Sequence, residues 1–442
     1  MKRRKHKVEY LKALVANDKG DVFDLDNYAA TGADGSVLSP LTSSDCTPMP
    51  YGSEIMYLPD RKPVLWNIAK KNFETLHENP YEPGTPVFPA AAFNSPGYMI
   101  SHTSSYEESA DAGYLPLFSY GAVGWSEKKG FMTAVIQVDK ERRQDLRLMK
   151  PEKIAAGIRK MQKAMPSNRL EKHLENCALK YGCPAGKNFF LGRYEAPLPT
   201  SRACNARCLG CISLQADQKI IPSSQNRINF TPSPEEIKEV ALSHILRVKN
   251  PVVSFGQGCE GDPLLAADAI IPAISMIREK TDEGTINMNT NGSCPDILEG
   301  LFDAGLDSIR ISINSVRKSC YNAYFRPVSY KFEDVLQSID LARQRGKFVS
   351  INYLNCPGIT DSPEESDELF KFLKNHRINM IQWRNLNFDP LRYMQTMNQA
   401  APHSRPTGMK PLLEKIRKNF PQIRYGYFNP PKEKYGTSRH DA

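Results

Sequence analysis

The sequence predicts an α/β protein in which a barrel of parallel strands, or a large part of one, follows a mixed, β-rich region. Six strand-like segments alternate with helix-like segments between residues 189 and 400, which is typical of parallel βα units with right-handed crossovers. Before residue 137, short apolar runs lie between turns rich in Pro, Gly, Ser and Asn.

We therefore expect four parts: a mixed β-rich domain over 1–137, a helical connector over 138–188, the core barrel over 189–400 and a short basic C-terminal extension over 401–442. In the first part, the aromatic segment 115–125 is expected to pair with the run 131–136 as a hairpin. In the connector, apolar residues spaced for one face predict helix over about 139–179.

The barrel elements follow in order. Ser233 and Ser362 each precede Pro-Glu-Glu, a pattern that predicts a capping box at the start of a helix. The expected strands are 189–195, 252–255, 285–288, 308–313, 348–353 and 380–383. One expected helix begins at 233, and the others cover about 264–279, 296–303, 332–345 and 362–376. Loops after the carboxyl ends of such strands build active sites.

Composition describes an ordinary globular chain of 442 residues with 40% hydrophobic residues and a net charge of +9. No apolar run reaches the length of a membrane span, and the charges among residues 8–19 do not fit a signal peptide. Ten cysteines without an export signal indicate a reducing cytoplasm. Positive residues gather only in 1–7 and 410–434, so nucleic-acid binding is permitted but not favoured.

Cys204, Cys208 and Cys211 follow the first predicted barrel strand with the spacing C-x3-C-x2-C. Three thiolates this close can hold three irons of a 4Fe-4S cluster and leave the fourth iron open to a ligand. A structural zinc site and a ferredoxin-type carrier both need a fourth ligand, and the next cysteine is Cys259. Zinc binding and inert thiols are the alternatives to the cluster.

The triplet and its surroundings resemble the radical S-adenosylmethionine (radical SAM) superfamily. The resemblance covers about 189–389 and implies a partial (β/α)6 TIM-type barrel whose open iron chelates S-adenosylmethionine (SAM). It further implies an enzyme that receives one electron from a donor such as a flavodoxin or ferredoxin, cleaves SAM reductively and abstracts hydrogen from a substrate.

Several downstream motifs are similar to SAM-contacting motifs of that family. Residues 256–263 (GQGCEGDP) resemble its Gly-Gly-Glu-Pro loop, where Glu260 and Asp262 both qualify as the carboxylate for the SAM ammonium group. Asn291 lies in a Thr-Asn-Gly turn, and Ser312 and Asn314 match strand positions that hydrogen-bond SAM. The alternatives are a glycine-rich turn, an ordinary Asn-Gly turn and polar filling of a barrel lumen. A dinucleotide site at Gly256 fits less well, because no ribose-binding acid follows.

The chain also departs from the family pattern. Gly210 stands where many members place an aromatic residue, and no cysteine follows Cys356 to serve auxiliary clusters. Cys177 and Cys183 precede the barrel as possible ligands of a second metal, although two ligands do not make a site. Cys259, Cys320 and Cys356 could each donate a hydrogen atom, be methylated or simply be buried thiols.

Three function classes follow. The first is a radical SAM enzyme that acts on a small molecule, a peptide or a protein. The second is a radical SAM enzyme that modifies RNA, and the third is a non-enzymatic iron-sulfur or zinc binding module. The sequence assigns no catalytic residue beyond the cofactor ligands and no substrate.

Overall fold

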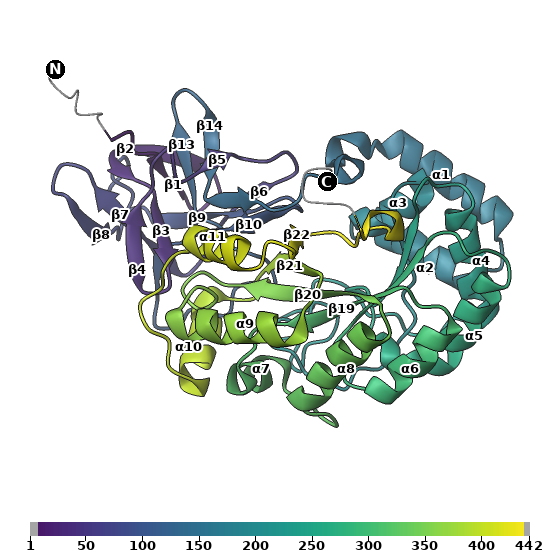
Figure 1. Ribbon diagram of the computed structural model, residues 1–442. Helices are drawn as coiled ribbons and strands as arrows, with labels where there is room; N and C mark the ends of the chain where they lie inside the picture. Colours follow the sequence, from purple (N-terminus) through teal and green to yellow (C-terminus); the bar gives the residue numbers. More distant parts are fainter. Residues whose placement is uncertain (1–7, 437–442) are drawn as a thin grey trace, which may run out of the picture. The chain divides into compact units, whose positions relative to one another are not determined.

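The computed structural model describes residues 8–436 (Figure 1), so the basic segment 1–7 lies outside the described residues. Contacts divide this part of the chain into two compact units. The first, here the β unit, comprises 8–138, Asn355–Asp367 and Asn385–Lys418; the second, the barrel unit, comprises Asp139–Leu354, Glu368–Arg384 and 419–436.

The β unit is rich in antiparallel strands, which confirms the β-rich N-terminal region. Its largest sheet has the order β12-β7-β2-β1-β13-β14-β5, with β9, β6 and β8 attached, and β11-β3-β4 and β10-β15 form smaller sheets. The predicted hairpin is present, since Val123 of β13 pairs with Thr133 of β14. The strands are β1 (Lys12–Ala16), β2 (Val22–Ala29), β3 (Thr31–Asp34), β4 (Val37–Pro40), β5 (Thr47–Pro48), β6 (Glu54–Tyr57), β7 (Arg61–Asn67), β8 (Asn72–Thr75), β9 (Phe88–Phe93), β10 (Tyr98–Ile100), β11 (Thr103–Ser104), β12 (Tyr106–Glu108), β13 (Val123–Ser126), β14 (Gly130–Thr133) and β15 (Val135–Gln137).

Two later helices, α10 (Pro390–Ala400) and α11 (Met409–Asn419), belong to the β unit almost entirely. Asp389 caps α10 by accepting hydrogen bonds from the backbone N–H groups that follow it. The same carboxylate forms an ion pair with Arg61 at 3.1 Å, and both side chains are fully buried. A residue of the first strands is thereby tied to a segment more than 300 positions later.

The helical connector differs from the prediction in two places. Residues 139–179 form short 3-10 turns η1 (Arg142–Gln144) and η2 (Leu146–Leu148) and two helices, α1 (Pro151–Ala164) and α2 (Arg169–Leu179). Asn168 interrupts the stretch because its side chain caps α2 through Glu171 N–H at 3.0 Å. The strand predicted over 189–195 is wrong: most of it lies in helix α3 (Pro184–Leu191) and the turn after it.

The barrel unit contains one sheet in the sequential order β16 to β22, which confirms the partial barrel. Strands β16 to β20 pair with one another in parallel, and so do β21 and β22. The strands are β16 (Glu195–Pro197), β17 (Val252–Phe255), β18 (Thr285–Thr290), β19 (Ser308–Ile313), β20 (Phe348–Asn355), β21 (Met380–Asn385) and β22 (Arg424–Gly426). The helices and 3-10 turns are α4 (Pro234–Ile245), η3 (Pro263–Ala266), α5 (Ala267–Arg278), α6 (Pro295–Ala304), α7 (Lys318–Phe325), α8 (Phe332–Gln344), α9 (Pro363–His376) and η4 (Lys432–Lys434).

Alternation along the strands separates an apolar face from a polar one. On β19, Ile309 and Ile311 are completely buried, whereas Ser308 and Arg310 point to the opposite face. Arg310 donates to the Gln382 side chain of β21 at 2.9 Å, across the intervening strand β20. A contact that skips a strand requires a concave surface, so the polar face is the lumen, and Figure 1 shows α4, α5, α6 and α8 along the outer face.

Helix α4 begins with the capping box that the sequence predicts at Ser233. Ser233 Oγ accepts from Glu236 N–H at 3.3 Å, and the Glu236 carboxylate accepts from Ser233 N–H at 2.8 Å. This reciprocal pair confirms the first capping box. At the second, Ser362 Oγ accepts from Glu365 N–H at 3.3 Å.

None of the helices within 8–436 combines the length and apolar character that crossing a membrane requires.

Candidate functional site at the cysteine loop

The cysteine triplet lies in a loop that leaves the carboxyl end of β16, where active-site residues of βα barrels gather. Cys204, Cys208 and Cys211 are each half-buried. A hydrogen bond from Cys211 N–H to Cys208 O, 3.3 Å long, turns the end of this cysteine loop back on itself. The local fold therefore brings the triplet to the rim of the sheet.

One side of the cysteine loop is paired with the loop after β17. Gly261 N–H donates to Ser201 O at 2.6 Å, and Asp262 N–H donates to Ala203 O at 2.9 Å. A Cβ atom on Gly261 would lie 1.8 Å from Ala203 O, which is far inside van der Waals contact. Only glycine permits this approach of two backbones, so the resemblance of 256–263 to a glycine-rich loop has a structural cause.

The other side of the cysteine loop is paired with the end of α7. Arg207 N–H donates to Phe325 O at 2.9 Å, and Leu209 N–H donates to Tyr324 O at 3.0 Å. Residues more than 100 positions downstream thus hold the segment between the cysteines. Sequence analysis missed this support, because a backbone-to-backbone contact leaves no signature in the side chains that make it.

Glu260 connects the two paired loops. Its Oε2 accepts from the N–H groups of Thr200 and Ser201 at 2.7 and 2.9 Å, and its Oε1 accepts from Gln257 N–H at 2.6 Å. Burial raises the pKa of this carboxyl group to about 7, although the backbone donors favour its ionised form. Its contacts are those of a residue that fixes the entrance to the cysteine loop.

Asp262 connects the loop after β17 to the end of β18. Its Oδ1 accepts from Thr290 Oγ1 at 2.7 Å and from Leu264 N–H at 3.1 Å, and its Oδ2 accepts from Asn291 N–H at 2.7 Å. Burial raises the pKa of Asp262, whereas these donors lower it. The carboxylate is also close enough to Cys204 to raise the pKa of that thiol.

Asn291 reaches the cysteine loop directly. Its side-chain N–H donates to Asn205 Oδ1 at 2.8 Å, and Asn205 in turn donates to Ser293 Oγ at 2.9 Å. Asn205 lies between the first two cysteines, so this amide chain joins the loop to the carboxyl end of β18. The structure thus brings Asn291 together with the cysteines, and Asn205 is a further member of the site that the sequence did not reveal.

Ser312 and Asn314 follow on the next strand and have different surroundings. Ser312 lies on the lumen face of β19 in register with Asn352 of β20, whose buried Oδ1 has no hydrogen-bond partner within the described residues. Such a buried acceptor suits a ligand that brings its own donor, as SAM would. Asn314 donates to Cys320 O at 3.2 Å and is fully buried.

The chemistry of the triplet fits a cationic iron-sulfur cluster. Burial, assisted by Asp262, raises the pKa of Cys204 to about 11, and burial with the neighbouring cysteines raises the pKa of Cys208 as well. Thiolates that destabilise one another in this way need a positively charged partner.

One cation was missed by sequence analysis. Arg227 Nη2 lies 3.5 Å from Cys211 Sγ, and its Nε donates to Ser213 Oγ at 3.2 Å. Hydrogen bonds to cluster sulfurs tune the reduction potential of a bound iron-sulfur cluster, so Arg227 is placed to act on one held here. Arg227 stands 16 positions after Cys211 in a segment without regular structure, so no local pattern marked it.

Comparisons with known proteins agree with this geometry. Residues 198–372 match the family model described as the radical SAM superfamily. Over 181 residues the chain is 25% identical to the FeMo cofactor biosynthesis protein NifB of Klebsiella pneumoniae, covering 37% of this chain and 38% of that protein. Over 142 residues it is 28% identical to the dual-specificity RNA methyltransferase RlmN of Buchnera aphidicola subsp. Baizongia pistaciae (strain Bp), covering 29% and 37%.

The chain thus spans less than half the length of either relative. Methylornithine synthase (PylB), a solved structure, aligns with 64% of this chain and 74% of its own at 15% identity and a TM-score of 0.37. Residues 198–372 are thus the part of the chain that matches the radical SAM superfamily, whose enzymes use a 4Fe-4S cluster and S-adenosylmethionine.

Proposed function

We propose that the protein is a radical SAM enzyme that holds a 4Fe-4S cluster through Cys204, Cys208 and Cys211. The observation that carries the proposal is the triplet at the carboxyl end of β16, braced by backbone pairing on both sides. When bound, the reduced cluster supplies the electron that cleaves SAM, and hydrogen is then removed from a substrate. An electron donor such as a flavodoxin or ferredoxin and a cytoplasmic location belong to the same proposal.

The two carboxylates have different roles in this proposal. Both Glu260 oxygens are well occupied, because Oε2 accepts two N–H groups and Gln257 and Gly256 also donate to the carboxylate. Within residues 8–436, Asp262 Oδ2 accepts from Asn291 N–H alone and so retains a lone pair for an ammonium group. We therefore assign Asp262 to the SAM ammonium group and Glu260 to support of the loop.

The remaining contacts complete the proposed SAM site. Asn291 follows the end of β18 and Ser312 lies near the end of the neighbouring strand β19, so both stand beside the cysteine loop's edge of the sheet. Asn314 follows Ser312 by two positions, on the same strand-end segment. The role of these side chains is to orient SAM, while the paired loops limit the access of water.

The deciding experiment uses protein purified without oxygen, with its cluster reconstituted and reduced, and measures 5'-deoxyadenosine after SAM is added. We expect product from the wild type and from Cys46→Ala, a buried cysteine of the β unit, and none from Cys208→Ala. A fully loaded cluster that yields no product and no spectral change with SAM would contradict the proposal.

A second candidate is modification of RNA, which the likeness to an RNA methyltransferase favours and the net charge of +9 permits. Phosphate contacts make RNA binding strongly dependent on salt. If RNA is the substrate, affinity for a mixed RNA pool falls steeply as salt rises. Binding that is weak at every salt concentration leaves a small molecule, a peptide or a protein as the substrate.

A further inference from the structure

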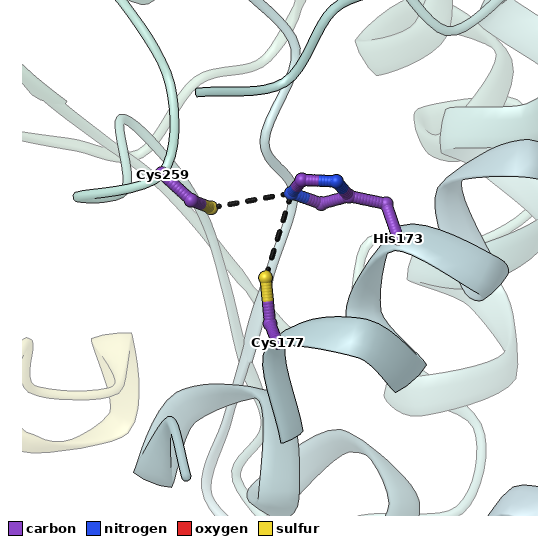
Figure 2. A group of neighbouring side chains, drawn as sticks. All are labelled: His173, Cys177 and Cys259. Carbon is purple, nitrogen blue, oxygen red and sulfur yellow. Dashed lines mark hydrogen bonds between the residues drawn. The ribbon is translucent and has the colours of Figure 1, made fainter. Parts of the chain in front are cut away.

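A second group of metal-binding side chains lies in the barrel unit, apart from the cysteine triplet. His173 and Cys177 are four positions apart on α2 and therefore share one face of that helix. Cys259 approaches them from the loop after β17 (Figure 2). The three ligand atoms, one from each side chain, all lie within 4.8 Å of one another. This set is here called the His-Cys-Cys cluster.

The distances in the His-Cys-Cys cluster fit one tetrahedral ion. His173 Nε2 lies 3.4 Å from Cys259 Sγ and 3.5 Å from Cys177 Sγ. A tetrahedral zinc ion with Zn–N near 2.0 Å and Zn–S near 2.3 Å holds nitrogen and sulfur about 3.5 Å apart. The side chains therefore stand almost where such an ion would require them.

Hydrogen bonds link all three side chains, because the two thiols also pair with each other. Both sulfurs approach the same nitrogen, as the two dashed lines in Figure 2 show. A neutral imidazole nitrogen carries either one proton or one lone pair, so it can serve one partner well but not two. Cys177 and Cys259 are both buried, and their sulfurs and the imidazole nitrogen form one closed group of polar atoms. A shared cation would satisfy all three atoms together.

A fourth ligand is close at hand. Cys183 directly precedes α3, and its backbone N–H donates to Cys177 O at 3.0 Å. Its thiol also interacts electrostatically with those of Cys177 and Cys259. With Cys183 added, the donors would be those of a Cys3His site, a common set for structural zinc.

We propose that His173, Cys177 and Cys259 bind a zinc-type divalent ion, with Cys183 as the fourth ligand. Sulfur and imidazole donors select such a thiophilic ion over magnesium or calcium. Cys259 immediately precedes Glu260, so the ion would fasten α2 to the loop that supports the cysteine loop. The helical connector would then brace the cluster site without entering its chemistry.

The experiment counts metal in the full chain carrying Cys204→Ala, Cys208→Ala and Cys211→Ala, because the triplet could itself collect zinc. Elemental analysis is expected to give about one zinc per chain in this parent and less than about a tenth of that after Cys177→Ala and Cys259→Ala are added. The matched control adds Cys46→Ala and Cys320→Ala, two buried cysteines outside both sites, and should keep its zinc.

Equal zinc in the paired variant and in the control would overturn the proposal. So would a Cys177–Cys259 disulfide in zinc-free parent protein, or iron and sulfide retained in place of zinc. If the parent does not fold, His173→Ala in the otherwise wild-type chain tests the same point, since it should lose zinc and keep the iron of the triplet. Counting zinc and iron separately distinguishes this result from failure of the proposed function.

Discussion

Glu260 and Asp262 show how neighbouring acids of one loop acquire different tasks. Both side chains are buried, and the sequence makes them equal candidates for SAM. Glu260 receives donors from two segments of backbone, whereas Asp262 receives a side-chain hydroxyl and keeps an open position on Oδ2. The number of hydrogen-bond donors around each carboxylate oxygen is set by the fold. It distinguishes Glu260, which anchors the loop, from Asp262, which is the proposed SAM contact.

Glu260→Gln tests the anchor at the residue scale. The amide replaces one acceptor oxygen by a donor that faces backbone N–H groups, so at least one buried N–H group loses its partner. We expect the variant to lose about 2–4 kcal/mol of unfolding free energy at pH 8, where the wild-type group is ionised. Urea unfolding measures the change, with exposed Glu279→Gln as control. Equal losses of unfolding free energy in Glu260→Gln and Glu279→Gln would contradict the role of Glu260 as an anchor of the loop.

At the scale of the elements, the loop after β17 depends on Gly261. The 1.8 Å approach that a Cβ would make to Ala203 O forces the two paired loops apart. We expect Gly261→Ala to reduce the iron retained per chain several-fold. Gly300→Ala is the matched control, because a Cβ there meets only Ile271 at 3.4 Å and α6 gains about 0.5–1 kcal/mol from alanine. Full iron retention by Gly261→Ala would show that the loops do not need close pairing.

The capping box of α4 gives a second prediction at this scale. Ser233→Ala removes the acceptor of Glu236 N–H and is expected to cost about 1 kcal/mol in urea unfolding. Ser275→Ala, inside α5, removes only a hydroxyl that donates back to Ile271 O. That control should be neutral or slightly stabilising. A Ser233→Ala chain as stable as the control would mean that tertiary contacts alone fix the start of α4.

Element by element, the sequence predicted what local signals determine. Strands β17 and β19 begin and end where their apolar runs do, and Ser233 marks the start of α4. The apolar run at Phe189 failed because a short run fits strand and helix equally. Pro184 at the first turn and Gly192, with φ of 63°, were the helix signals that could have resolved it.

Prediction of the site followed the same division. The cysteine spacing is local and was visible, and Asn291 was found because it ends a strand next to the loop. Arg227, Asn205 and the carbonyls of α7 were missed, because only the folded chain brings them to the cysteines. His173 and Cys259 lie 86 positions apart, so the second cluster had no contiguous pattern, although the helical spacing of His173 and Cys177 was a signal.

At the scale of the whole molecule, the chain leaves the β unit and returns to it twice. The β unit consists of three separate stretches of the chain, whereas the predicted domains 1–137 and 189–400 are each one continuous range. The predicted domain boundaries therefore stay a prediction. The returning segments are bonded to the first strands by buried polar groups, among them the pair of Arg61 and Asp389. Stability of the unit therefore depends on the ionisation of groups far apart in sequence.

A buried pair of acids makes this dependence measurable. Asp34, at the end of β3, is hydrogen-bonded to Asp361 in the first returning segment. Asp361 also accepts from the N–H groups of Gly358 and Gly408 at 2.7 and 2.9 Å. Burial and the charge of Asp361 raise the pKa of Asp34, and burial raises the pKa of Asp361. One proton shared between the two carboxyl groups relieves their repulsion.

The sign of the pH effect follows from this pair. In the unfolded chain Asp34 loses its proton near its ordinary pKa of 3.8, whereas the folded pair keeps one to higher pH. Its stabilisation is thus complete below pH 3.8 and is lost as pH rises through the raised pKa of the folded state. We expect the β unit to lose about 1–3 kcal/mol of unfolding free energy from about pH 5 to pH 8.

Asp34→Asn should flatten that slope, because an amide donates to Asp361 at every pH and carries no charge. Exposed Asp18→Asn should leave the slope unchanged. Urea unfolding of the full chain at several pH values, followed by the fluorescence of the β-unit tryptophans Trp66 and Trp125, measures both. Equal slopes in the wild type and Asp34→Asn would mean that the acids do not share a proton. The joint between first strands and returning segment would then depend on packing and backbone contacts, such as that of Gly35 with Gly358.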